Sequence, residues 1–228
     1  MHACDCGTPA EFPGWHRCVE YIPRANAICR VVFPKLLGWI WAAGVPLFHV
    51  VGGGQYYQQL PGYQRAKKLA GPPPKPRETI AADPTLRRLQ QFRSDHVFVG
   101  KHNQADVARG SARIDFLPEA RPLGDEGVAE NGEQLFALCK AAGVNHLVYA
   151  GFAINWCLLL SPGGMHEMSC RGILCSAFRD ATTAVENKES ARRQWAKELG
   201  LWRVALAFGF VFDVDDLIAA LASCPRGT

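Results

Sequence analysis

The segment from Gly143 to Cys157 constrains the fold most, because it combines a short buried strand with a chemically reactive side chain. Residues 144–150 form a mainly apolar run with a glycine on each side, which is typical of a central parallel strand covered on both faces. Gly151 lets the chain turn, and a helix is expected to begin near Cys157. In open α/β sheets, ligands bind at this carboxyl edge of the strands.

The position of Cys157 makes it a candidate nucleophile. A helix amino end favours the thiolate form of a nearby cysteine, which is the nucleophilic form. The alternative is a structural role, since free cysteines are among the most buried residue types and often pack as small hydrophobic side chains.

The order of the other elements predicts the fold class. An apolar stripe over residues 25–43 predicts a helix that Pro34 kinks or restarts. Strands and helices then alternate, so we expect an α/β fold with a mostly parallel sheet and helices on both faces, in three α/β/α layers. The expected strands are residues 45–51, 96–100, 144–150, 173–178 and 210–214, and the later helices are 133–142, 187–208 and 215–221.

At 228 residues the chain has enough material for one domain with a sizeable core. We expect an irregular amino-terminal segment without a strand over residues 1–24 and a single domain over residues 25–228. Residues 52–94 read as a long connection, a feature that usually serves as a lid, an oligomer contact or a disordered segment. The Gly52–Gly54 triplet lacks the Lys-Ser/Thr pair of a phosphate-binding loop, so it is interpreted as a flexible turn.

Composition narrows the classes of partner. No run approaches the length of a membrane-spanning helix, so no membrane partner is expected. The net charge of +4 is modest and the basic residues are scattered, so no nucleic-acid partner is expected. Nine cysteines at irregular spacing, without a signal peptide, favour reduced thiols and a cytoplasmic location.

A metal cluster of cysteine and histidine is the alternative reading of the amino-terminal segment. Its candidate ligands are Cys4, Cys6, Cys18, His2 and His16. Their spacing matches no common zinc pattern, so neither a metal nor another cofactor is expected.

Several polar residues follow expected strands. Lys101 follows the strand at 96–100, Cys157 follows the strand at 144–150, and Asp180 follows the strand at 173–178. Because the carboxyl ends of parallel strands meet at one edge of a sheet, these three side chains predict a site there.

Four short motifs together resemble the isochorismatase-like cysteine hydrolases. They are Gly-Phe-Ala-Ile-Asn-Trp-Cys157, Ser-Pro-Gly-Gly-Met165, Arg171-Gly172 and Arg179-Asp180-Ala181. The resemblance runs from about residue 25 to residue 221 and is strongest between residues 143 and 186. It implies a Rossmann-like fold, a catalytic Asp, Lys and Cys, a small-molecule substrate, and a homo-oligomer. Members of this family mostly hydrolyse C–N bonds of small amides, ureido or carbamoyl compounds through a covalent acyl-enzyme.

The resemblance assigns roles to individual residues. Cys157 corresponds to the nucleophile, and Lys101 to the catalytic lysine just past a strand. A cis peptide bond is expected between Phe152 and Ala153. The N–H groups of Ala153 and Cys157 would then form an oxyanion hole. The zinc ligands of nicotinamidase-type relatives have no counterpart, since residues 52–62 contain no histidine.

The catalytic Asp of the family is the main departure. In the family it ends the first strand, which lies in the centre of the sheet, but no strand is expected here before the first helix. We therefore expect the fold to lack this strand, and we hypothesise that the chain is an amino-terminally shortened family member. Asp5 is the candidate replacement, although it follows no expected strand and a surface position is favoured.

The sequence thus supports two principal functions. The first is a cysteine-dependent hydrolase of small amide-like compounds. The second is a catalytically silent relative that acts as a subunit or binding scaffold. Hydrolysis of the isochorismate ether bond does not use the cysteine in the family, so the presence of Cys157 disfavours it.

Overall fold

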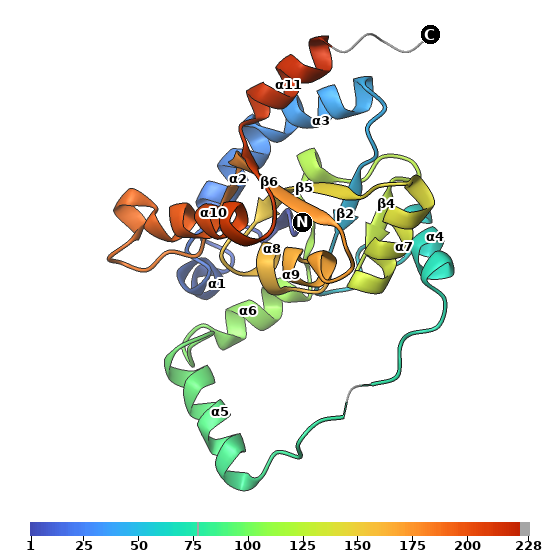
Figure 1. Ribbon diagram of the computed structural model, residues 1–228. Coiled ribbons are helices and arrows are strands. Elements are labelled where there is room, and N and C mark those ends of the chain that lie inside the picture. The colour runs from blue at the N-terminus through green and yellow to red at the C-terminus, as the bar shows by residue number, and fades with distance from the viewer. Residues whose placement is uncertain (77, 224–228) are drawn as a thin grey trace.

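Two small parallel sheets form the centre of the molecule, and helices cover them on both sides (Figure 1). The computed structural model describes residues 1–76 and 78–223, so the expected domain end at residue 228 lies outside the described residues. The strands are β1 (Cys4–Asp5), β2 (Phe48–Val50), β3 (Asp115–Phe116), β4 (Gly127–Ala129), β5 (His146–Phe152), β6 (Leu174–Thr183) and β7 (Val211–Phe212).

The helices alternate with the longer strands as expected for an α/β fold. They are α1 (Pro13–Cys18), α2 (Ile22–Val31), α3 (Phe33–Ala42), α4 (Pro61–Ala70), α5 (Pro84–His96), α6 (Gln104–Ser111), α7 (Gly132–Ala142), α8 (Cys157–Leu160), α9 (Met165–Ser169), α10 (Trp195–Ala207) and α11 (Val214–Ser223). Within the described residues, no helix is long and apolar enough to cross a bilayer.

The parallel strands are divided between two sheets. Strand β2 pairs with β4, and β5, β6 and β7 form a second sheet in that order. Strands β1 and β3 form a separate antiparallel pair. The predicted fold class, a Rossmann-like α/β fold with parallel strands, is confirmed, and the parallel strands are divided between two sheets rather than placed in one.

Met1 and His2 link the two sheets. The Met1 amino group donates to the Ala150 carbonyl oxygen (2.8 Å), and Phe152 N–H donates to the Met1 carbonyl oxygen (3.1 Å). On the other side, His2 N–H donates to the carbonyl oxygen of Val50 in β2 (2.9 Å). Among the described residues, no strand pairs with both β2 and β5. An apolar cavity of about 240 Å³ occupies this region instead, lined by both strands and by α3.

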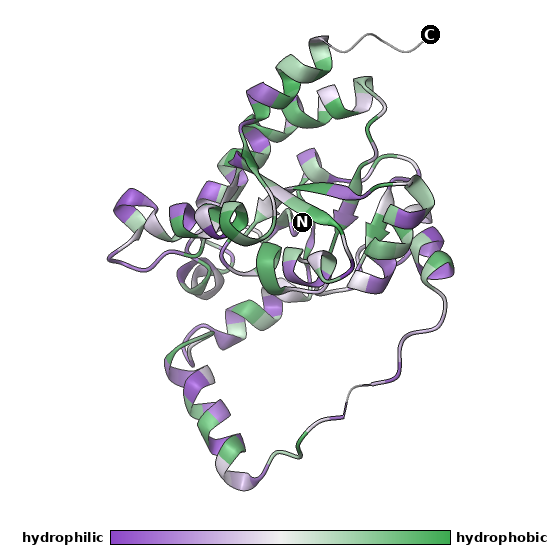
Figure 2. Ribbon diagram, in the orientation of Figure 1, coloured by the Kyte–Doolittle hydropathy of each residue, from purple (hydrophilic) through white to green (hydrophobic). Residues whose placement is uncertain are grey.

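Two apolar cores lie on opposite faces of the sheets. On one face, strand side chains pack against Leu135, Leu138, Leu158, Met165, Met168, Leu201 and Val204 from α7 to α10. On the other face, Phe152 and Phe178 of the strands pack against Cys29, Phe33, Leu36, Ile40 and Val214 from α2, α3 and α11. Figure 2 shows the hydrophobic residues of β5 and β6 at the centre of the molecule. The burial of both sheet faces explains the nearly continuous apolar strands in the sequence.

Local signals account for several helix boundaries. Pro34 lies in the first turn of α3, where its missing N–H costs nothing, and the chain restarts there after α2 as predicted. Asn131 caps α7 by accepting from Gln134 N–H (3.0 Å). Gly143 ends α7 with a φ of 67°, a left-handed conformation that favours glycine, and the chain then enters β5.

The expected strand at residues 96–100 is wrong. Helix α5 is capped by Asp83, whose carboxylate accepts from Leu86 N–H (2.7 Å), and it continues through His96. The following residues form a turn in which Lys101 N–H donates to the Asp95 carbonyl oxygen (2.8 Å). The apolar run Val97-Phe98-Val99 has β propensity but gains no neighbouring strand, so tertiary context overrides the local preference. Helix α5 buries none of its residues and extends away from the body (Figure 1).

Other boundaries also differ from the sequence-based expectation. Residues 102–131, where no element was expected, contain α6, β3 and β4, and residues 1–24, where no strand was expected, contain β1 and α1. Strand β6 continues to Thr183, so Asp180 lies inside it rather than past its end. The helix expected over residues 187–208 begins only at Trp195, as α10.

The half-buried His2 side chain predicts a pH dependence of stability. Burial, and secondly the nearby Met1 amino group, lower the pKa of His2 from 6.5 to about 4. The unfolded chain therefore binds a proton at His2 before the folded chain does, and stability is lost as the pH falls from about 6.5 toward 4. A shift of this size corresponds to a loss on the order of 3 kcal/mol.

We expect this loss to be smaller in His2→Leu, which has no titrating group at this position. Urea unfolding of both proteins between pH 7 and pH 4 measures the difference. Equal pH slopes for the two proteins would show that His2 is not held neutral in the fold.

Candidate active site

Cys157 is the first residue of α8 and follows the loop that leaves the carboxyl end of β5. Its side chain is a half-buried free thiol. The predicted location, where a strand gives way to a helix, is confirmed. However, α8 has only four residues, so the helix-dipole effect expected from the sequence is weaker than that of a full-length helix.

Hydrogen bonds from the neighbouring strand hold the loop before Cys157. Ile154 N–H donates to the Thr183 carbonyl oxygen (2.9 Å), which extends the β5–β6 contact beyond the sheet. Asn155 then makes two hydrogen bonds to the backbone of Val185. Its Nδ2 donates to the Val185 carbonyl oxygen (2.9 Å), and its Oδ1 accepts from Val185 N–H (2.9 Å). The backbone beneath the thiol is therefore fixed relative to the sheet.

The loop also contains the backbone groups that the resemblance singled out. The peptide bond between Phe152 and Ala153 is cis. The Ala153 carbonyl oxygen accepts from Trp156 N–H and from Leu158 N–H, both at 3.1 Å. Among the described residues, the N–H groups of Ala153 and Cys157 donate no backbone hydrogen bond outside regular elements.

Buried titratable groups surround the Cys157 thiol. Burial raises the pKa of the Tyr21 hydroxyl, and a thiolate at Cys157 raises it further. Burial also raises the pKa of the Cys4 thiol, whose Sγ lies 3.6 Å from the Tyr56 hydroxyl oxygen. On the same side of the molecule, burial lowers the pKa of the Met1 amino group to about 6. Cys157 therefore faces residues of the amino-terminal segment, which the sequence analysis treated as separate from the site.

Lys101 lies in the exposed turn that follows α5, not at a strand end. The turn does reach the candidate site, since the ring of Phe98 packs edge-on against the ring of Trp156, with 5.0 Å between ring centroids. Trp156 directly precedes Cys157. The predicted arrangement of Lys101, Cys157 and Asp180 at three ends of one sheet is wrong.

The two carboxylates considered from the sequence have local structural roles. Asp180 Oδ1 accepts from Val214 N–H (3.0 Å) at the start of α11. Asp5 is exposed, and its Oδ1 accepts from Gly7 N–H (2.8 Å). Neither contact points to a proton transfer at Cys157.

Glu130 is the polar residue that follows β4, and the sequence analysis missed it. Its carboxylate accepts hydrogen bonds from the hydroxyl groups of Tyr57 (2.8 Å) and Tyr63 (2.7 Å). Burial alone would raise the pKa of Glu130, but these hydrogen bonds hold it below its usual value. The signal in the sequence was the short run Gly-Val-Ala-Glu directly before the helix cap Asn131, which is too short to identify as a strand by pattern alone.

Two cysteines of the amino-terminal segment make local contacts with the backbone. The Cys6 thiol donates to the Cys4 carbonyl oxygen (3.7 Å), and the Cys18 thiol donates to the Trp15 carbonyl oxygen (3.4 Å). In the part of the chain that the structure describes, no three His, Cys, Asp or Glu side chains are grouped to hold a metal ion.

Comparisons with known proteins agree with the resemblance found in the sequence. No family model matches the chain. The chain is 28% identical over 124 residues to the ureidoacrylate amidohydrolase RutB of Serratia proteamaculans. The alignment covers 51% of this chain and 46% of that protein. It thus spans about half the length of this curated relative.

Two solved structures are similar in outline. One is a cysteine hydrolase from Pseudomonas syringae pv. phaseolicola, with a TM-score of 0.48 and 16% identity over 83% of this chain and 78% of that chain. The other is an isochorismatase-like hydrolase from Alkaliphilus metalliredigens, with a TM-score of 0.47 and 18% identity over 86% of this chain and 84% of that chain. The chain resembles the isochorismatase-like hydrolases.

The double contact between Asn155 and Val185 predicts the effect of a substitution on stability. Asn155→Ala removes both hydrogen bonds and leaves two backbone groups of Val185 without these partners. We expect the free energy of unfolding to fall by about 1–3 kcal/mol. Chemical denaturation monitored by tryptophan fluorescence measures this loss.

Asn155→Asp is the graded control, because its carboxylate still accepts from Val185 N–H but cannot donate to the carbonyl oxygen. It should lose less stability than the alanine variant. If both variants unfold like the wild type, Asn155 does not anchor the loop.

Proposed function

We propose that this chain is a cysteine-dependent hydrolase that cleaves C–N bonds of a small amide, ureido or carbamoyl compound, with Cys157 as the nucleophile. The observation that carries the proposal is the placement of the free Cys157 thiol on a fixed loop beside two available N–H groups, those of Ala153 and Cys157. The similarity to a ureidoacrylate amidohydrolase supports the class of bond.

The proposed reaction has two steps. The Cys157 thiolate attacks the carbonyl carbon, and the N–H groups of Ala153 and Cys157 stabilise the developing oxyanion. The tetrahedral intermediate collapses to a thioester, and the amine leaves as its C–N bond breaks and it takes a proton from water. A second water molecule then hydrolyses the thioester, which yields the carboxylic acid and restores the thiol.

The source of the base distinguishes this proposal from the usual family mechanism. The carboxylates predicted from the sequence, Asp5 and Asp180, are engaged elsewhere, so the proton of Cys157 passes to hydroxide or a buffer base. Attack then depends on the fraction of thiolate, and the rate rises with pH.

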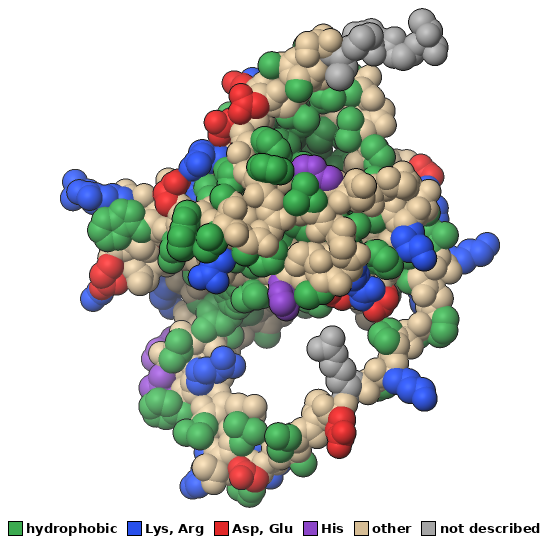
Figure 3. Space-filling model, in the orientation of Figure 1, with side chains coloured by type: hydrophobic (Ala, Val, Ile, Leu, Met, Phe, Trp, Pro, Cys, Tyr) green, Lys and Arg blue, Asp and Glu red, His purple; other side chains and the backbone are tan. Residues whose placement is uncertain are grey.

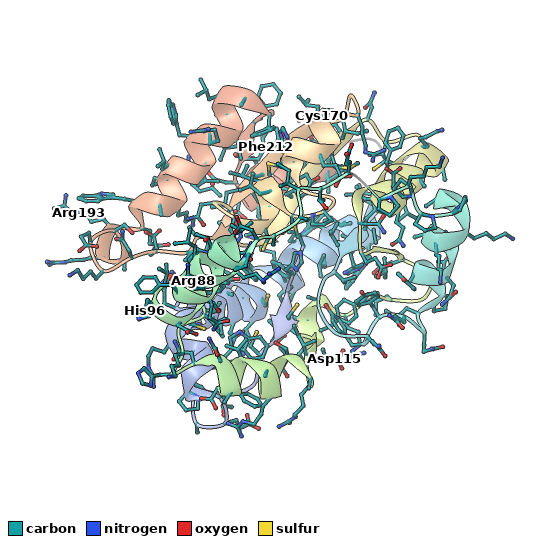
Figure 4. The ribbon with its side chains drawn as sticks, turned by 90° about the horizontal axis from the view of Figure 1, so that it is seen from below. Arg88, His96, Asp115, Cys170, Arg193 and Phe212 are labelled. Atoms are coloured by element: carbon teal, nitrogen blue, oxygen red, sulfur yellow. The ribbon has the colours of Figure 1, made fainter. Side chains whose placement is uncertain are left out.

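A panel of small amides and ureido compounds, assayed for ammonia release, tests the role of Cys157. We expect Cys157→Ala to lower the rate by at least about a thousandfold, because no other group can form the acyl-enzyme. Cys170→Ala is the matched control, since Cys170 is an exposed thiol outside the site and its loss should leave the rate unchanged. Figure 4 shows Cys170 at the edge of the molecule. Mass spectrometry of the quenched reaction should find the acyl group on Cys157.

The role of Lys101 is a separate prediction. If its ammonium group moves over Cys157 when substrate binds, it stabilises the thiolate and the oxyanion, and Lys101→Met should lower kcat/KM by about 10- to 100-fold. Lys188→Met is the control, because Lys188 is highly exposed and remote in sequence from the loop of Cys157. An unchanged kcat/KM in Lys101→Met would remove Lys101 from the mechanism.

A second candidate function is a catalytically silent relative that binds a partner or acts as a subunit. The residue after β4 favours it, because Glu130 and its two tyrosine partners occupy a strand end where the resemblance leads one to expect a lysine. A folded protein that neither releases ammonia from any compound of the panel nor acylates Cys157 would support this second function.

A further inference from the structure

The outward face of α10 carries an apolar stripe. Its members are Trp195, Leu199, Trp202 and Leu206, which remain 54%, 59%, 57% and 63% exposed. Their spacing of four, three and four residues places them on one side of the helix. Phe210, just beyond the helix, is also 57% exposed. Figure 3 shows hydrophobic side chains gathered over α10 on this face of the molecule, and apolar patches of this kind mark surfaces that bind a protein or a membrane.

The inner side of α10 is fixed to the body, so the stripe is not the core face of the helix. Leu201 and Val204 are buried there. The amino end is held by the buried Glu186, whose carboxylate accepts from Ala196 N–H (3.1 Å) and Lys197 N–H (2.9 Å). The stripe is therefore held in place and faces the solvent.

The exposed acidic side chains beside the stripe are already in ion pairs. Between residues 187 and 213 they are Glu189, Glu198 and Asp213. Glu198 Oε2 lies 2.8 Å from Arg179 Nη1, and Asp213 Oδ1 lies 3.9 Å from Nε of the same arginine. Glu189 Oε1 lies 3.5 Å from Lys188 Nζ. Each negative charge of this segment thus has a positive partner within the molecule.

Three arginines of the same segment are exposed and make no ion pair within the described part of the chain. Arg192 and Arg193 lie in the single turn of 3-10 helix before α10, and Arg203 lies on α10 itself. The Arg193 guanidinium lies over the ring of Trp195, with Cζ 5.6 Å from the ring centroid, so a positive charge directly contacts the stripe. Figure 4 shows Arg193 projecting from the margin of the molecule. Lys197, which is half-buried, adds a further positive charge to the segment.

We propose that this face binds the surface of an anionic lipid membrane. The stripe inserts between the lipid headgroups, and Arg192, Arg193 and Arg203 lie against the acidic groups of the lipids. Helices that lie in a membrane interface combine Trp, Phe and Leu on one face with Lys and Arg beside them. Tryptophan prefers the level of the headgroups, because its ring is apolar and its N–H is polar.

The sequence analysis expected no membrane partner because it considered only the length of a spanning helix. A helix that lies on the membrane surface needs no such length, since its inner side stays in contact with the protein. What identifies it is the exposure of the stripe, which depends on how α10 packs on the body.

The unpaired charges favour a lipid surface over a second copy of the chain. A second copy would present the same three arginines, and its own carboxylates in this segment would already be paired. Like charges that face each other without counter-charges oppose association. An anionic membrane supplies the missing negative charge, and each arginine near its surface strengthens the attraction.

Cosedimentation of the full chain with lipid vesicles tests the proposal. Vesicles of phosphatidylcholine alone are compared with vesicles that also contain about 30% phosphatidylserine. We expect binding to the anionic vesicles to be about 10- to 100-fold tighter, and to weaken as salt is added, because salt screens the charges of the arginines. Tryptophan emission should shift to shorter wavelength on binding, because the rings of Trp195 and Trp202 leave water.

Two substitutions in the stripe locate the binding surface. Leu199→Glu and Trp202→Glu should each weaken binding to the anionic vesicles by about 10-fold or more, because each brings a carboxylate among acidic headgroups. Leu89→Glu on α5 is the matched control, since Leu89 is also well exposed, at 62%, and should leave binding unchanged.

A double substitution tests the charges. Arg192→Gln combined with Arg193→Gln should lower the preference for phosphatidylserine by about 10-fold. Arg87→Gln combined with Arg88→Gln on α5 is the control, because these two arginines are also adjacent and exposed, and it should leave the preference unchanged. Circular dichroism checks that every variant is folded.

Several results would overturn the proposal. They are a wild-type protein that does not bind anionic vesicles, equal binding to both kinds of vesicle, and unchanged binding of Leu199→Glu and Trp202→Glu. Loss of binding in Leu89→Glu would place the contact on α5 instead. A wild-type dimer in sedimentation velocity that Trp202→Glu separates, without binding to vesicles, would assign the stripe to a second copy.

Discussion

The parallel pairing of β5 with β6 is the contact on which the candidate site depends. It begins with His146 opposite Leu174 and runs to Phe152 opposite Thr183. Beyond the strands it continues through Ile154 and then through the two hydrogen bonds of Asn155. Because each of these bonds fixes the next residue, the chain reaches Cys157 with little freedom, and the thiol is presented at the edge of the sheet.

The divided sheet shapes the surroundings of this thiol. Among the described residues, Met1 and His2 connect β2 with β5 by hydrogen bonds, and the apolar cavity lies alongside them. The lining of that cavity does not include Cys157. The candidate site therefore lies beside the amino-terminal segment and the Phe98–Trp156 contact, while the apolar cavity reflects how the two sheets meet.

Helix α10 lies between the loop of the candidate site and the solvent. Gly200 and Leu201 pack on the inner side of this helix, close to the loop of Ile154, and the exposed tryptophan residues lie on its outer side. A helix with one face in the core and another apolar face toward solvent is unusual for a surface helix, whose outer face is normally polar.

Sequence patterns determined the elements whose causes are local. The apolar run before Gly151, the restart at Pro34, the cap at Asn131 and the left-handed Gly143 each have a short-range physical cause, so the α/β order and the position of Cys157 could be predicted. Other features depend on partners far away in the chain. Residues 97–99 would suit a strand but pair with no strand in the described part of the chain, whereas residues 127–129 form one because β2 lies beside them. For the same reason only the tertiary structure decided that Glu130, and not Lys101, follows a strand, and that Asp180 is bound to the start of α11. Residue type and spacing specify what a segment prefers, but strand pairing and burial are set by the segments that surround it.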